Sequence, residues 1–168
     1  MVTPIAMNHI AYQTTDLAAT HAFWTEAVGA KLVGAVRQDR ATTSSGEAMN
    51  PFLHVFYELK SGECIAFFDV AGDYEAKDDG LEWWAKHVAL SVSSDEELEE
   101  MAQQLKNHGV QVRGTVDHDG LWHSIYCFDP SGVHLEITHQ TRPLNEKDAE
   151  DAQVLYDAWL ADRATDRV

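Results

Sequence analysis

The spacing of apolar residues changes several times along the chain, and each change marks a strand or a helix. Residues 5–14 and 84–92 alternate or run apolar and are rich in β-branched side chains, which predicts strands. Residues 16–28 and 94–108 place apolar residues three and four positions apart, which predicts amphipathic helices. A Ser-x-x-Glu capping box opens the second helix, and a glycine follows each helix, as is typical of helix ends.

Three further strands are predicted after each helix. They cover residues 31–38, 52–59 and 64–70 in the first half, and residues 111–116, 124–128 and 133–139 in the second. The order is therefore β-α-β-β-β, twice. The first strands of the two halves also resemble each other, because His9-Ile10-Ala11 recurs as His87-Val88-Ala89. This pattern predicts an α+β fold in which two βαβββ modules form a curved mixed sheet.

The whole chain, residues 1–168, is expected to form a single domain. Module 1 would span about residues 5–71, module 2 about 83–140, and a C-terminal helix about 147–163. The polar stretch 39–50 is the main difference between the halves and is expected to be a loop. The C-terminal helix is expected to pack on the sheet or on a partner subunit.

Charge and cysteine content narrow the classes of function. Twelve Lys and Arg against 28 Asp and Glu give a formal net charge of −16, which argues against nucleic acid and against an anionic membrane surface. No apolar run approaches the roughly 18 residues of a membrane-spanning helix. The first residues lack the features of an export signal, and Cys64 and Cys127 are isolated. We therefore expect free thiols and a cytoplasmic protein.

Strand parity places several chemically active side chains on one face of the sheet. On the first strand of each half, His9 and His87 point away from the apolar face that the helices must cover. On the last strand, His134 and Glu136 point to the same open side, because Leu135 and Ile137 are apolar. Two histidines and one glutamate have the composition of a 2-His-1-carboxylate site, so the curved sheet would surround a metal ion.

The duplicated βαβββ pattern with this placement of His9, His87 and Glu136 resembles the vicinal oxygen chelate superfamily over about residues 5–140. That superfamily includes glyoxalase I, bleomycin- and fosfomycin-resistance proteins, methylmalonyl-CoA epimerase and type I extradiol dioxygenases. The second half also matches the extradiol ring-cleavage signature, with the elements Val116-Asp117-His118, Ile125-Tyr126, Asp129-Pro130-Ser131-Gly132 and Glu136 at the spacings that the signature requires.

This resemblance implies an Fe(II)-dependent dioxygenase that cleaves a catecholic small molecule with O2. His9, His87 and Glu136 would hold the metal, and a purified sample could carry Mn, Ni or Zn instead. Tyr126 would hydrogen-bond the catecholate oxygen, and His118 would act as an acid, a base or a hydrogen-bond donor. Extradiol enzymes generally have a further active-site histidine, for which His54 is the candidate.

Several alternatives stay open. His123 competes with His118, because it lies three residues before Tyr126 in the sequence. His139 and the acidic run 95–100 are expected to be solvated or capping groups. Alignment of the two halves places Ala66 where the second half has Glu136, so a fourth protein ligand of the glyoxalase kind is not expected. The runner-up functions are a glyoxalase-like lyase or isomerase and a small-molecule binding protein of the bleomycin-resistance type. A homodimer or a higher homo-oligomer is expected.

Overall fold

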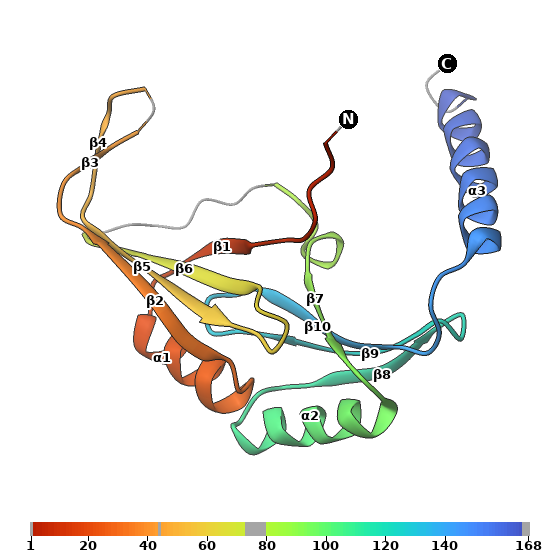
Figure 1. Cartoon of the computed structure of the whole chain (residues 1–168), viewed down its shortest axis with the longest axis horizontal. Helices are drawn as coiled ribbons and strands as arrows, with labels where there is room; N and C mark the ends of the chain where they lie inside the picture. The colour runs from red at the N-terminus through yellow and green to blue at the C-terminus, as the bar shows by residue number, and fades with distance from the viewer. Residues whose placement is uncertain (1, 44, 73–79, 166–168) are drawn as a thin grey trace.

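The computed structural model describes residues 2–43, 45–72 and 80–165, and these form two four-stranded sheets (Figure 1). The first sheet has the order β1 (His9–Thr14), β6 (Cys64–Val70), β5 (Phe52–Glu58) and β2 (Lys31–Gln38). The second has the order β7 (Val88–Val92), β10 (His134–Gln140), β9 (Trp122–Phe128) and β8 (Arg113–His118). In each sheet the first two strands of this order, β1 with β6 and β7 with β10, are parallel, and the other neighbouring strands are antiparallel. The predicted α+β fold of two βαβββ units is confirmed.

The two helices that follow the first strand of each half cover one side of the two sheets, and the core lies beneath them (Figure 1). Helix α1 (Leu17–Ala22) starts at Asp16, whose side chain accepts a hydrogen bond from the backbone of Ala19, and continues as the π-helix η1 (Phe23–Ala27). Helix α2 (Asp95–Asn107) is capped by Ser94, as the capping box predicts. Apolar side chains of both halves form one continuous buried cluster, so the two units are packed together rather than linked only by the chain.

The strand register shows that the two halves are copies of one frame. In the first sheet Ala66 pairs with Ala11 on one side and with Phe56 on the other. In the second sheet Glu136 pairs with Ala89 and with Tyr126 in the same way. The structure therefore confirms that Ala66 is the counterpart of Glu136, which the alignment of the two sequences predicted.

Two predicted segments take a different form. The strand predicted over residues 84–92 begins only at Val88, because Trp83–Ala85 form a 3-10 turn (η2) in which the ring of Trp83 lies against His134 and Phe128, 5.3 and 5.8 Å between centroids. The loop predicted over residues 39–50 contains a short hairpin of β3 (Ala41–Thr42) and β4 (Ala48–Met49).

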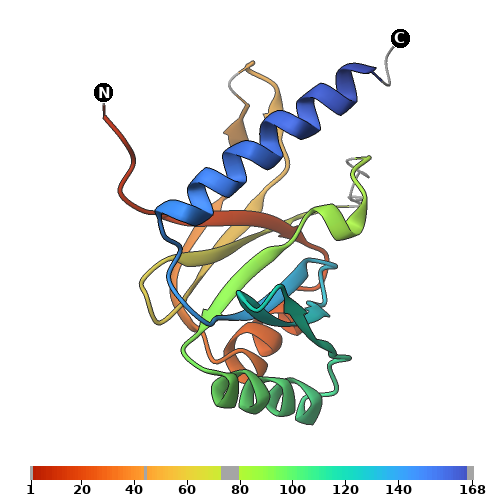
Figure 2. The ribbon, with the colours of Figure 1, turned by 90° about the vertical axis from the view of Figure 1, so that its right-hand side faces the viewer.

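The expectation that the C-terminal helix packs on the sheet is wrong. Helix α3 (Glu146–Thr165) projects from the sheets in both views (Figures 1 and 2). Its apolar residues Val154, Leu155, Tyr156, Trp159 and Leu160 are 49–71% exposed. Three of them are consecutive and so point about 100° apart, which spreads the apolar residues over a wide arc of the helix. Packing on a partner subunit stays a prediction. Within the described residues, no helix is long and apolar enough to span a membrane.

Candidate functional site

The carboxylate of Glu136 is the centre of a polar cluster on the face of the second sheet opposite α2. Its side chain is only 12% exposed and lies between two neighbouring strands. Oε1 accepts hydrogen bonds from the hydroxyl groups of Ser124 at 2.6 Å and Tyr126 at 3.0 Å. Oε2 lies 3.0 Å from Nε2 of His87, just before β7. The structure therefore brings together His87 and Glu136, which strand parity placed on the open face, and Tyr126, which the family resemblance assigned to the site.

His118 extends this cluster toward solvent. Its Nε2 lies 2.8 Å from the Tyr126 hydroxyl and 4.0 Å from Oε1 of Glu136, and its side chain is 42% exposed. The phenol has one proton, which it donates to Glu136, so the contact with His118 requires that Nε2 carries a proton and donates it. Burial, and then the hydrogen bond to Glu136, raises the pKa of Tyr126, so the phenol stays protonated at neutral pH.

Strand parity places His118 and His123 in different clusters. His123 is on β9 next to Ser124 and therefore points to the helix-covered side of the sheet, away from Tyr126. Its Nδ1 lies 2.8 Å from Oδ1 of Asp95 at the start of α2. Of the two histidines, His118 contacts Tyr126, and His123 belongs to a different cluster.

His134 lines the open face beside His87. Its ring stacks on Tyr126 and Phe128, with centroids 5.5 and 4.8 Å apart, and lies edge-on to His87 at 5.8 Å. Its Nδ1 is buried and, among the described residues, has no hydrogen-bond partner. Burial, and then the neighbouring His87, lowers the pKa of His134, so this imidazole is neutral near pH 7.

His9 and His54 lie together on the first sheet, among aromatic rings. His9 is exposed, its Nδ1 lies 2.7 Å from Oδ1 of Asn8, and its ring is 6.1 Å from that of His54 and 5.4 Å from that of Phe56. His54 stacks on Phe68 at 3.7 Å between centroids, and its Nε2 is buried without a hydrogen-bond partner in the described part of the chain. His54 therefore shares the face of His9, a point that the sequence left uncertain. Burial, and then His9, lowers the pKa of His54.

The predicted ligand trio is not gathered at one point. Among the described residues, one group of three or more His, Cys, Asp or Glu side chains has ligand atoms that all lie within 4.8 Å of one another. That group is Asp95, His123 and His139, and not the predicted trio. Of the trio, His87 and Glu136 are in contact while His9 lies outside this distance. The assignment of all three as ligands of one metal stays a prediction.

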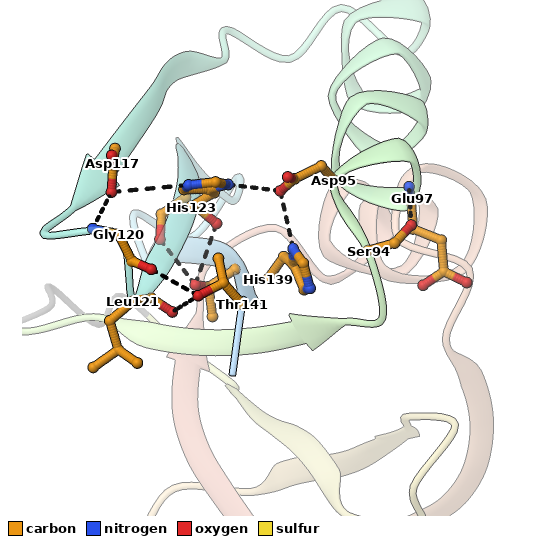
Figure 3. A network of polar contacts seen from close by, with 11 residues as sticks. Ser94, Asp95, Glu97, Asp117, Gly120, Leu121, His123, His139 and Thr141 are labelled. Carbon is orange, nitrogen blue, oxygen red and sulfur yellow. Dashed lines mark hydrogen bonds and ion pairs between the residues drawn. The ribbon is translucent and has the colours of Figure 1, made fainter. Parts of the chain in front are cut away.

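The cluster of Asp95, His123 and His139 was missed by the sequence analysis, which treated Asp95 and His139 as solvated or capping groups. Oδ1 of Asp95 lies 2.8 Å from Nδ1 of His123 and 2.9 Å from Nδ1 of His139 (Figure 3). The two histidines are direct cross-strand partners of β9 and β10. The hydrogen bonds from His139 and then His123 lower the pKa of Asp95, which keeps the carboxylate ionised.

The duplicated βαβββ units, with polar groups on their uncovered face, define a class of α+β proteins. The sequence places the chain within that class: the family model described as Glyoxalase/Bleomycin resistance protein/Dioxygenase superfamily matches residues 6–137. The chain belongs to this superfamily. Among curated proteins, no sequence matches the chain significantly.

Solved structures agree with this assignment at the level of the fold. A glyoxylase/bleomycin resistance protein/dioxygenase domain from Frankia sp. EAN1pec has a TM-score of 0.64 and 18% identity, covering 82% of this chain and 99% of that one. The fosfomycin resistance protein FosX from Listeria monocytogenes has a TM-score of 0.59 and 20% identity, with coverage of 86% and 98%. Lactoylglutathione lyase from Agrobacterium tumefaciens has a TM-score of 0.56 and 18% identity, with coverage of 81% and 94%.

Proposed function

We propose that this protein is an Fe(II)-dependent extradiol dioxygenase that cleaves the ring of a catecholic small molecule with O2. The observation that carries the proposal is the continuous chain of contacts from His118 through Tyr126 to Glu136 and His87 on the uncovered face of the second sheet. These four residues come from separate strands and turns. The proposal also rests on the match of the second half to the extradiol signature.

The donor set fits a divalent metal. Neighbouring ligand atoms at right angles around an ion with bonds of about 2.1 Å are about 3.0 Å apart, and His87 Nε2 lies 3.0 Å from Glu136 Oε2. We assign His87 and Glu136 as two ligands. We assign His9 as the third because it holds the position on β1 that His87 holds before β7. When bound, iron(II) supplies Lewis acidity toward the hydroxyl groups of a catechol and redox chemistry toward O2.

The protein's own residues would then control protons at the substrate. The Tyr126 hydroxyl, which donates to Oε1 of Glu136, would turn to donate to a substrate oxygen held beside this carboxylate. Its raised pKa keeps this proton in place at neutral pH. His118 holds a proton on Nε2 next to the phenol oxygen and is partly exposed, so it can exchange protons with solvent and pass them to the site.

The first sheet would supply the wall for an aromatic ring. His9, His54, Phe56 and Phe68 form one group of ring contacts on the uncovered face. Planar apolar surfaces favour planar substrates, because aromatic rings pack by offset stacking or edge-to-face contact. The buried Nε2 of His54, without a partner among the described residues, is a group that a substrate hydroxyl would satisfy.

A glyoxalase-like lyase or isomerase and a binding protein of the bleomycin-resistance type are the competing functions. FosX and lactoylglutathione lyase share the fold at about 20% identity or less, which is too low to carry their reactions over. Ala66 occupies the register position of Glu136 in the first sheet and offers no ligand atom. We therefore favour a site with open metal positions, which a catechol and O2 require.

The test is anaerobic reconstitution with Fe(II), followed by a panel of catechols under air. We expect uptake of one O2 per catechol and the visible absorbance of a ring-cleaved semialdehyde. Tyr126→Phe should lower turnover about 10- to 100-fold, since it removes one hydrogen bond to a charged group. His108→Gln is a matched control, because among the described residues the ring of His108 bonds a helix carbonyl at the end of α2 and no residue of the proposed site. Intact iron binding without oxygen uptake on any catechol would replace this proposal by the binding-protein alternative.

The third ligand is tested separately by measuring Fe(II) affinity. His9→Gln should weaken iron binding at least 10-fold, whereas His118→Gln should leave it nearly unchanged and lower turnover. The opposite result would assign the third ligand to His118, which already lies 4.0 Å from Glu136.

A further inference from the structure

We propose that Asp95, His123 and His139 form a second metal site, selective for a divalent first-row transition ion such as Zn(II). The site is independent of the proposed dioxygenase function. It lies at the start of α2, on the side of the second sheet that this helix covers (Figure 3). Glu136 and Tyr126 point to the other side, so the two sites are separated by the sheet itself.

The three ligand atoms are already close enough to share one ion. Nδ1 of His123 and Nδ1 of His139 lie 2.8 and 2.9 Å from Oδ1 of Asp95. Around an ion with bonds of about 2.1 Å, neighbouring ligand atoms are about 3.0 Å apart at right angles and about 3.4 Å apart at the tetrahedral angle, so the two contacts with Asp95 would open by about 0.1 to 0.6 Å. All three ligand atoms lie within 4.8 Å of one another. Two imidazoles with one carboxylate suit Zn(II), Cu(II) or Ni(II) better than Mg(II) or Ca(II).

The residues around the ligands also have the arrangement expected of a metal site. Nε2 of His123, on the far side of its ring, lies 3.8 Å from Oδ1 of Asp117. The same Asp117 oxygen accepts a hydrogen bond from the backbone of Gly120, which fixes the carboxylate in place. A carboxylate behind a metal-bound histidine orients the ring and raises its basicity. Asp117 is therefore a positioning residue for His123.

The ligands come from rigid elements, and an ion can reach them. His123 and His139 are paired across the β9–β10 ladder, and Asp95 is the first residue of a capped helix. The side chains are 28%, 20% and 52% exposed, so the site opens to solvent while both rings are largely held by the protein. The positive end of α2 opposes a cation there, but the first turn carries three carboxylates, at Asp95, Glu96 and Glu97. Asp117 adds a fourth, so the local charge favours a divalent ion.

The competing interpretation is a metal-free cluster of hydrogen bonds that ties α2 to the sheet. The two are distinguished by titration with Zn(II) in a His87→Gln/Glu136→Gln background, from which the proposed iron site is removed. We expect this double variant to bind one Zn(II) per chain by calorimetry, and to give the visible absorbance of imidazole-bound Co(II). Adding Asp95→Asn or His139→Gln should weaken binding at least 100-fold, whereas adding His108→Gln should leave it unchanged.

Asp117→Asn should weaken Zn(II) binding about 10- to 100-fold and shift the Co(II) spectrum, as expected of a residue that acts through His123. Circular dichroism of each variant shows whether it is folded. If His139→Gln does not fold, Asp95→Asn, whose side chain is exposed, carries the test instead. The wild-type protein should bind two ions. The proposal would be overturned if the double variant bound no Zn(II), or if Zn(II) binding survived both Asp95→Asn and His139→Gln. Neither result would affect the test of the dioxygenase function.

Discussion

Asp129 connects the turn between β9 and β10 to the first half of the chain, so replacing it with asparagine should weaken the fold. Its Oδ1 accepts hydrogen bonds from the backbone amides of Ser131 and Val133, both at 2.8 Å. Its Oδ2 accepts one from the indole Nε1 of Trp24 at 3.2 Å. Asp129 is 5% exposed and Trp24 is fully buried. An asparagine oxygen could keep the two backbone contacts, but its NH2 group would face the indole N–H.

The expected loss of stability can be estimated from the indole N–H of Trp24, which would lose its hydrogen-bond acceptor. A buried N–H group without a partner costs about 1–3 kcal/mol. Part of this is recovered, because burial raises the pKa of Asp129 and the ionised carboxylate is therefore unfavourable in this position. We expect Asp129→Asn to lower the free energy of unfolding by about 1–2 kcal/mol at pH 7, as measured by urea denaturation with far-UV circular dichroism.

A double-mutant cycle isolates the contact. Trp24→Phe removes the indole donor and also leaves a cavity, so its own cost is larger, but the coupling free energy with Asp129→Asn should be about 1 kcal/mol. Ser131→Ala is the matched control in the same turn. It loses a hydroxyl contact with Thr20 at 3.0 Å but leaves the indole bond intact. Additive effects of Trp24→Phe and Asp129→Asn would show that this bond does not hold the two halves together.

The pH dependence gives a second check on Asp129. Its pKa in the folded protein is raised above the ordinary 3.8, so the folded state binds a proton more readily than the unfolded state does. The contribution of this group to stability is therefore full below pH 3.8 and is lost as the pH rises through the folded pKa. The wild-type protein should gain stability relative to Asp129→Asn as the pH falls from 7 toward 4, and a difference that shrinks on acidification would contradict the sign.

Three further predictions use other parts of the fold. Gly114→Ala should lower the free energy of unfolding by at least about 2 kcal/mol, because φ is +112° and a Cβ would lie 2.7 Å from a β9 carbonyl oxygen. Gly120→Ala, at φ +68° in open space, should lower it by about 1 kcal/mol. Equal losses for the two variants in urea denaturation would contradict this reasoning. Burial raises the pKa of the Cys127 thiol to about 11, so this residue should react with a thiol reagent about 100-fold more slowly in the folded protein than in urea. Rapid labelling of the folded protein would show that Cys127 is not buried. The wild-type protein should sediment as a homodimer or larger species, and Leu155→Glu with Trp159→Glu in α3 should shift it toward the monomer; a monomeric wild type would show that the expected oligomer is wrong.

The fold could be predicted because its signals are local. The capping box at Ser94 fixes the start of α2, and the bounds of β2 and β6 coincide with the predicted residues 31–38 and 64–70. The predicted strand start at residue 84 was wrong because side-chain contacts of Trp83 with the neighbouring hairpin compete with strand pairing. Such contacts join residues far apart in the sequence, and no local pattern contains them.

The candidate site could be predicted only as far as strand parity extends. Parity correctly put His87 and Glu136 on the same uncovered face, because side chains alternate along each strand. It could not give the distance from either residue to His9, since that distance depends on how the two sheets pack. Packing is set by contacts between the halves such as the bond from Trp24 to Asp129.

The pairing of His123 with His139 was within reach of the sequence. The Asp-Pro-Ser-Gly turn fixes the register of the β9–β10 hairpin, and counting outward from it pairs these two histidines directly. The third member, Asp95, could not be found this way. It belongs to a helix that reaches the hairpin only through the packing of the core, and its position in an acidic run is also typical of a helix start.

The two sheets have matching strand registers, but their uncovered faces carry different kinds of side chain. Ser124, Tyr126 and Glu136 in the second sheet occupy the positions of His54, Phe56 and Ala66 in the first. One half therefore presents a largely buried carboxylate with its hydrogen-bond donors, and the other presents aromatic rings. The proposed catechol substrate would match both surfaces, because its hydroxyl edge is polar and its ring is flat and apolar.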